Sequence, residues 1–167
     1  AVQPDVWRGS GSATFLITRP LILLGLAPAV AVRSVFILAF LMGSLGVYFW
    51  LRPRFGDRAA GLAGVLYTLL PPLLATVYVR GSLADALVLG LWPLALAGLS
   101  VYVQSRSPAA MGAAVISLLW IWRTQAGLAV FVTLLALIYV LVVERDRLAL
   151  ITTGVGQHQM WAAQWYH

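Results

Sequence analysis

Long uncharged apolar runs alternate with short charged segments along most of the chain. Five such runs lie at positions 34–51, 59–79, 86–105, 107–122 and 124–143. Their lengths are 18, 21, 20, 16 and 20 residues. Because a bilayer core about 30 Å thick requires about 20 apolar helical residues, each run has roughly the length of a transmembrane span. The pattern predicts a polytopic membrane protein.

The type of secondary structure in these spans follows from the absence of water in the hydrocarbon. Backbone groups there must be satisfied within the protein, so a span is either a helix or a strand of a closed barrel. Barrel strands alternate polar and apolar residues. The run from Val35 to Met42 is apolar almost throughout and does not alternate. The predicted fold class is therefore all-α, a polytopic transmembrane helix bundle of about five spans.

The spans divide the chain into four predicted regions. Residues 1–12 form an outer polar segment, and residues 33–149 form the five-helix bundle. Residues 13–32 are apolar, but Arg19-Pro20 and Pro28 are expected to break them into short pieces, because proline disrupts a helix interior. We interpret this region as an interfacial or re-entrant helix, with a complete span as the alternative. The polar and aromatic tail, 150–167, is left unassigned.

The arginines indicate an orientation. The segment from Arg52 to Arg58 contains three of them, the densest positive cluster in the chain. Loops rich in arginine and lysine favour the cytoplasmic side. Alternation then places the turns at 78–85 and 123–126 outside. The expected location is a bacterial cytoplasmic (inner) membrane.

Composition excludes several classes of function. Charged residues make up 10% of the chain and the net charge is +6, but the arginines are scattered singly, so no nucleic-acid partner is expected. The chain has no cysteine, and both histidines lie in the C-terminal tail. We therefore predict no metal site and no cofactor, with a divalent cation as an addition only if the protein is catalytic. Membrane lipids are the expected partners.

The most informative local feature is the segment from Tyr78 to Asp85, which holds Arg80 and Asp85 between two apolar runs. Charges near membrane depth are costly and often mark function. Gly81-Ser82 is suited to begin a helix, whose positive end favours an anion beside Arg80. A lipid-linked phosphate is the anion expected there. The alternative is that Asp85 simply pairs with Arg80.

Two further arginines, Arg33 and Arg123, are predicted to lie at the same face. They either assist in binding the phosphate or extend to the lipid headgroups without a further role. Glycines recur at positions 43, 46, 61 and 64. Small residues at this spacing are typical of helix packing.

The order of these segments resembles integral membrane glycosyltransferases of the GT-C superfamily and their relatives, the YfhO-like and 6-pyruvoyl-tetrahydropterin-synthase-related membrane proteins. The resemblance covers about residues 13–148. It includes the apolar segment ending at Pro28, the arginine that opens a span at Arg33, and the basic turn Arg52–Arg58. The strongest part is Tyr78-Val-Arg80-Gly-Ser-Leu-Ala-Asp85, which is similar to a tyrosine-x-arginine-glycine-x-x-x-acid segment of the family.

The resemblance implies a glycosyltransferase that uses a polyprenyl-phosphate-linked sugar at the outer membrane face. Arg80, Asp85, Arg33, Arg123 and Tyr78 would then bind the lipid phosphate. In these enzymes a catalytic acid lies in the first outer loop. Here only Asp5 occupies a comparable position, so the chain resembles a fragment or a reduced relative.

Two functions therefore stay open. One is a glycosyltransferase-like protein in which Asp5 is the catalytic base. The alternative is a non-catalytic structural subunit of a larger membrane complex, packing against partner helices and lipids.

The predicted topology can be tested by cysteine labelling. A membrane-impermeant thiol reagent added from outside the cell should modify Ser82→Cys and spare Gly56→Cys, because the two turns are predicted to lie on opposite sides. The reverse labelling pattern would overturn the orientation.

Overall fold

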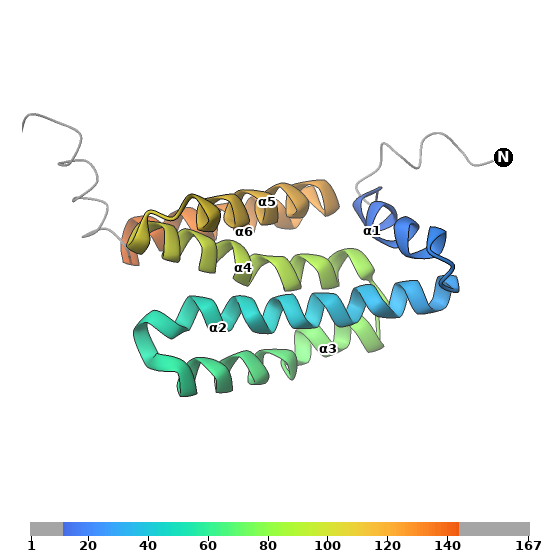
Figure 1. The fold of residues 1–167 in the computed structure, drawn as a ribbon, viewed down its shortest axis with the longest axis horizontal. Helices are drawn as coiled ribbons and strands as arrows, with labels where there is room; N and C mark the ends of the chain where they lie inside the picture. Colours follow the sequence, from blue (N-terminus) through green and yellow to red (C-terminus); the bar gives the residue numbers. More distant parts are fainter. Residues whose placement is uncertain (1–11, 144–167) are drawn as a thin grey trace, which may run out of the picture.

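A computed structural model describes residues 12–143 of the chain and shows a bundle of α-helices (Figure 1). The elements are α1 Ser12–Leu23, α2 Pro28–Thr68, α3 Pro71–Tyr78, α4 Leu83–Ser105, α5 Pro108–Thr124 and α6 Ala126–Val143. Within this described range there is no strand. The prediction of an all-α helix bundle is confirmed.

Helix α2 folds back on itself, and its second arm returns along the bundle together with α3. Gly56 has φ +77° and ψ 172°, which interrupts the helical geometry and reverses the chain. Positive φ is accessible to glycine without steric cost. Figure 1 shows the two arms of α2, before and after this reversal, running side by side in opposite directions. The expected loop between Arg52 and Arg58 is thus a sharp reversal between helical residues.

Three candidate spans are long and apolar enough to cross a membrane within the described residues: Pro28–Tyr78, Leu83–Ser105 and Ala126–Val143. The first contains 51 residues, because it includes both arms of α2 together with α3. Helix α5, with 17 residues, is slightly shorter than these candidates. The helices therefore follow the five apolar runs of the sequence.

Prolines lie at the start of α2, α3 and α5. Pro28 begins α2, and Pro71 begins α3 after α2 ends at Thr68. The expected break at Arg19-Pro20 is wrong, because Pro20 lies inside α1. The chain instead leaves the helix near Gly25, where φ is +92°. Proline inside an apolar helix is tolerated when neighbouring groups satisfy the freed carbonyl.

Helix α1 is short. Its 12 residues extend about 18 Å at 1.5 Å per residue, less than the thickness of the hydrocarbon core, about 30 Å. Residues 12–32 therefore do not form one continuous spanning helix. The assignment of α1 as interfacial or re-entrant stays a prediction.

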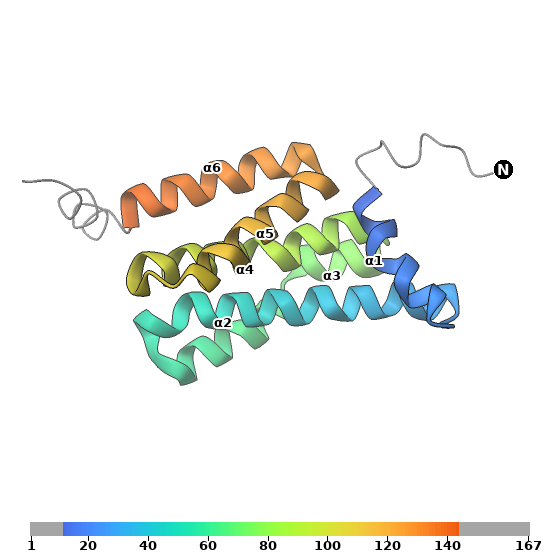
Figure 2. The same ribbon diagram turned by 45° about the horizontal axis from the view of Figure 1, so that its top comes forward.

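Helix α4 is the central element of the bundle, and it packs most extensively against α2 and α5 (Figure 2). Glycines permit this close approach. A Cβ added at Gly90 would lie 2.5 Å from the Ala39 carbonyl oxygen, and one added at Gly46 would lie 2.6 Å from the Leu94 nitrogen. The predicted packing role also holds for Gly43 and Gly64, which face Tyr67 and Ser44, whereas Gly61 faces open space.

Hydrogen bonds add to this packing. The Tyr67 hydroxyl donates to the Leu89 carbonyl oxygen at 2.6 Å, and the Trp92 Nε1 donates to the Tyr67 hydroxyl at 2.8 Å. These bonds connect the second arm of α2 to α4. They satisfy polar groups that would otherwise be costly in an apolar interior.

Glycine packing can be tested by adding single methyl groups. Gly90→Ala should lower the free energy of unfolding by about 1–3 kcal/mol, because the new methyl overlaps the α2 backbone. Gly61→Ala is the matched control, and it should leave stability unchanged or raise it by up to about 1 kcal/mol through helix propensity. Denaturant unfolding in detergent micelles measures both. Equal effects of the two substitutions would contradict the packing described here.

Candidate functional site

The charged positions predicted from the sequence gather at one end of the bundle. The start of α2, the α3–α4 turn and the α5–α6 turn all lie at the end opposite the Gly56 reversal (Figure 1). Arg33, Arg80, Asp85 and Arg123 belong to these segments. The alternation of the spans therefore brings them to the same end of the molecule.

The α3–α4 turn presents Arg80 and Asp85 through a short, well-defined reversal. Helix α3 ends at Tyr78, and Gly81 has φ +58°, a value that glycine adopts readily. Ser82 is the N-cap of α4, where its Oγ accepts a hydrogen bond from the Asp85 backbone nitrogen at 3.3 Å. The predicted helix start near Ser82, with Asp85 in the first turn, is confirmed.

Arg80 and Asp85 form an ion pair in which the two partners differ in exposure. The Arg80 Nη1 lies 3.3 Å from the Asp85 Oδ2. The Asp85 side chain is 9% exposed, whereas the Arg80 side chain is 66% exposed. A guanidinium carries five N–H donors, so one ion-pair contact leaves further donors available to a ligand. Asp85 therefore anchors Arg80 while most of the arginine stays accessible.

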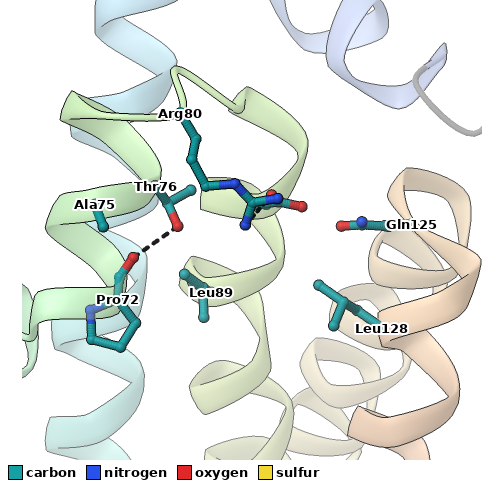
Figure 3. Close-up of a pocket in the computed structure, with 8 residues that line it drawn as sticks. Pro72, Ala75, Thr76, Arg80, Leu89, Gln125 and Leu128 are labelled. Carbon is teal, nitrogen blue, oxygen red and sulfur yellow. Dashed lines mark hydrogen bonds and ion pairs between the residues drawn. The ribbon is translucent and has the colours of Figure 1, made fainter.

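A pocket of about 400 Å³ opens beside this pair (Figure 3). Its polar lining comes from Thr76, Arg80, Asp85 and Gln125, and its apolar lining from Pro72, Ala75, Leu89 and Leu128. Figure 3 shows Arg80 and Gln125 extending toward the same space from opposite sides. The residues that line the pocket come from helices α3, α4 and α6 and from the α5–α6 turn.

Gln125 supplies a polar atom that has no partner. Its Oε1 is buried and accepts no hydrogen bond. The hydroxyl of Thr76, by contrast, already donates to the Pro72 carbonyl oxygen at 2.8 Å. Buried polar atoms are usually hydrogen-bonded, so an unsatisfied one at a pocket wall is well placed to bind a ligand group.

The structure does not bring all the predicted residues to this pocket. Tyr78 is 80% exposed at the end of α3 and does not line it, and Arg33 is exposed on α2. Arg123 lines a different cavity, of about 310 Å³, together with Leu16, Leu119 and Trp120. Asp5 lies outside the described residues. Arg80 and Asp85 are thus the two predicted site residues that share one pocket.

Gln125 and Thr76 were not predicted as site residues. Gln125 had a detectable signal, because it is a polar residue in the predicted turn at 123–126. Thr76 lies within an apolar run, and its place in the pocket follows from the break between α2 and α3. Residues 12–143 contain no group of three or more His, Cys, Asp or Glu side chains that could hold a metal ion. The polar groups that line the described pocket are a guanidinium, a carboxylate, an amide and a hydroxyl.

The bundle, with its long apolar helices, defines the protein as a helical integral membrane protein. Comparison with known families then gives a narrower assignment. Residues 12–163 match the model of the 6-pyruvoyl-tetrahydropterin synthase related domain, described as a membrane protein. The chain belongs to this family. No curated protein and no solved structure matches the chain.

The stability of the protein should respond differently to the removal of Arg80 and to the removal of Asp85. Arg80→Ala leaves a buried carboxylate without its cation and should lower the free energy of unfolding by about 1–3 kcal/mol. Asp85→Asn leaves an exposed guanidinium that water can hydrate, so its effect should stay within about 1 kcal/mol. The double variant Arg80→Leu/Asp85→Leu removes both charges and should be more stable than Arg80→Ala. Denaturant unfolding in detergent measures all three, and a double variant less stable than Arg80→Ala would contradict this account.

Proposed function

We propose that this protein is a GT-C-like membrane protein that binds a polyprenyl-phosphate-linked sugar at the outer face of a bacterial cytoplasmic membrane. The observation that carries the proposal is Arg80, which is anchored by a buried carboxylate and still 66% exposed beside a pocket. Arg80 binds the phosphate of the lipid. The positive-inside prediction supports placing this end of the bundle outside.

Arginine is well suited to this role. Its planar guanidinium binds phosphate through parallel hydrogen bonds and keeps its charge at any physiological pH. Asp85 fixes one side of the group, so less rotamer freedom is lost when the phosphate binds. Arg33 and Arg123 lie at the same end of the bundle and raise the local attraction for an anion without lining the pocket.

Gln125 supports a ligand that carries more than a phosphate. A phosphate ester at neutral pH is mainly an acceptor, whereas sugar hydroxyls donate hydrogen bonds. The unpartnered Gln125 Oε1 accepts such a bond across the pocket from Arg80. The pocket volume, about 400 Å³, falls within the range of about 300–1,000 Å³ that is typical of small-molecule sites.

The catalytic step rests on the resemblance to GT-C enzymes. There the acid that activates the acceptor lies in an outer loop, and Asp5 is its candidate in this chain. The contribution of the pocket would be to position the donor and to stabilise the leaving phosphate. Because Asp85 is engaged with Arg80, its role is to position that arginine rather than to accept a proton.

A second function is favoured by α6. Only 11% of its most apolar 18-residue window is buried, and Phe131 is 72% exposed. An exposed apolar face of this kind suits contact with partner helices as well as with lipid. The alternative is therefore a non-catalytic subunit that packs against other membrane proteins through α6.

Binding of lipid phosphate tests the first proposal. In nanodiscs, a long-chain polyprenyl phosphate should bind Arg80→Ala about 10–150-fold more weakly than the unmodified protein, which corresponds to the loss of a charged hydrogen bond of about 1.5–3 kcal/mol. Arg80→Lys should show an intermediate loss, because lysine keeps the charge without the planar fork. Native mass spectrometry or a fluorescent analogue measures the affinity.

Arg33→Ala is the matched control. It removes one arginine from the same end of the bundle but does not touch the pocket, so it should change the affinity by less than about threefold at physiological salt. The double variant Arg80→Leu/Asp85→Leu guards against an effect on folding, and it should lose binding although no unpaired charge remains. If polyprenyl phosphate binds the double variant as it binds the unmodified protein, the α6-mediated subunit is the better interpretation.

A further inference from the structure

A second cavity lies directly beside the Arg80 pocket. It has a volume of about 240 Å³ and is lined by Val88, Trp92, Phe131, Val132 and Leu135, together with Leu89 and Leu128. The last two residues also line the Arg80 pocket. One polar and one apolar cavity therefore meet at a shared wall between α4 and α6.

The apolar cavity extends from the Arg80 pocket toward the middle of the bundle. Helices α4 and α6 both begin at the end where Arg80 lies, and the lining residues of the second cavity continue from Leu89 to Trp92 and from Leu128 to Leu135. Seven residues of helix rise about 10 Å. The polar pocket thus lies near the bundle end, and the apolar cavity follows it to greater depth.

The lining of the deeper cavity offers no unsatisfied polar group. Its one polar side-chain atom, the Trp92 Nε1, already donates to the Tyr67 hydroxyl at 2.8 Å. Two of its lining residues also reach the outer surface of the bundle, since Phe131 is 72% and Leu135 is 48% exposed. The cavity is therefore an apolar groove that is accessible from the surrounding lipid.

We propose that this α4–α6 groove binds the isoprenoid chain of the lipid whose phosphate is held by Arg80. The inference rests on the proposed function and adds the path of the chain. A polyprenyl phosphate has an anionic head joined to one apolar chain, which matches a cationic pocket that shares two lining residues with an apolar groove. Trp92 and Phe131 present aromatic rings among aliphatic side chains, and the flat double-bonded units of an isoprenoid stack on such rings more closely than a saturated chain does.

The experiment uses two adjacent residues of α6 with nearly equal exposure. Leu135 lines the groove and is 48% exposed, whereas Leu134 is 50% exposed and does not line it. Leu135→Trp narrows the groove, and Leu134→Trp is the matched control. Binding of a long-chain polyprenyl phosphate and of water-soluble dimethylallyl phosphate is measured for each variant in nanodiscs.

If the groove binds the isoprenoid chain, Leu135→Trp should reduce the affinity for the long-chain ligand selectively. Leu135→Trp should weaken the binding of the long-chain phosphate by about tenfold or more, as expected when roughly two methylene-sized contacts are lost. The affinity for dimethylallyl phosphate should stay unchanged. Leu134→Trp should change neither affinity. Phosphatidic acid should compete poorly with the long-chain polyprenyl phosphate.

Three results would overturn the assignment of the groove. They are equal long-chain affinity in both tryptophan variants, equal loss of both ligands in Leu135→Trp, and competition by phosphatidic acid as strong as by the polyprenyl lipid itself. Failure of the proposed function gives a different pattern, because Arg80→Leu/Asp85→Leu would then leave the binding of both phosphates unchanged.

Discussion

The close approach of α4 to α2 is the constraint on which the remaining structure depends. Gly46 and Gly90 allow the two backbones to come so near that an added methyl group at either position would overlap the opposite helix. Helix α4 consequently lies at the centre of the bundle, and Asp85 and Ala86 in its first turn are buried. The carboxylate of Asp85 is therefore held in a poorly solvated position, where the adjacent Arg80 partners it. The geometry of the pocket follows from this packing.

The sequence predicted those features that depend on length and local chemistry. The apolar runs predicted the helices, and Gly81-Ser82 predicted the start of α4. Each of these follows from a residue's own backbone preference or from the thickness of a bilayer. The Arg80–Asp85 pair could also be predicted from the sequence, because a separation of five residues across a helix start brings the two side chains together.

Other features depend on contacts between distant segments and were therefore not predicted. Pro20 remains inside α1, contrary to expectation. Gln125 reaches the Arg80 pocket only because α5 and α6 pack against α4, and the same packing directs Arg123 to a different cavity. No spacing rule in a single sequence reports which of two neighbouring polar residues will face a given pocket. The positions of Gln125 and Arg123 could therefore be assigned only from the three-dimensional structure.

The assignment to a family of membrane proteins and the architecture of the pocket address different levels of function. The family match covers residues 12–163 and places the chain among membrane proteins of the 6-pyruvoyl-tetrahydropterin synthase related domain. The pocket adds a chemical expectation, because a largely exposed guanidinium, an unpartnered amide oxygen and an adjoining apolar groove together suit an amphipathic phosphate. The site supports an amphipathic phosphate as the ligand, and the proposal that this ligand is a polyprenyl lipid rests on the GT-C resemblance.

The central claim is that Arg80 contacts the phosphate of a bound lipid. Solid-state NMR measures this most directly, through the dipolar coupling between ³¹P of a polyprenyl phosphate and ¹⁵N-labelled arginine side chains in membranes. The account predicts a coupling that is present in the unmodified protein and in Arg33→Lys and absent from Arg80→Lys. A coupling that survives in Arg80→Lys, or that disappears in Arg33→Lys, would contradict it.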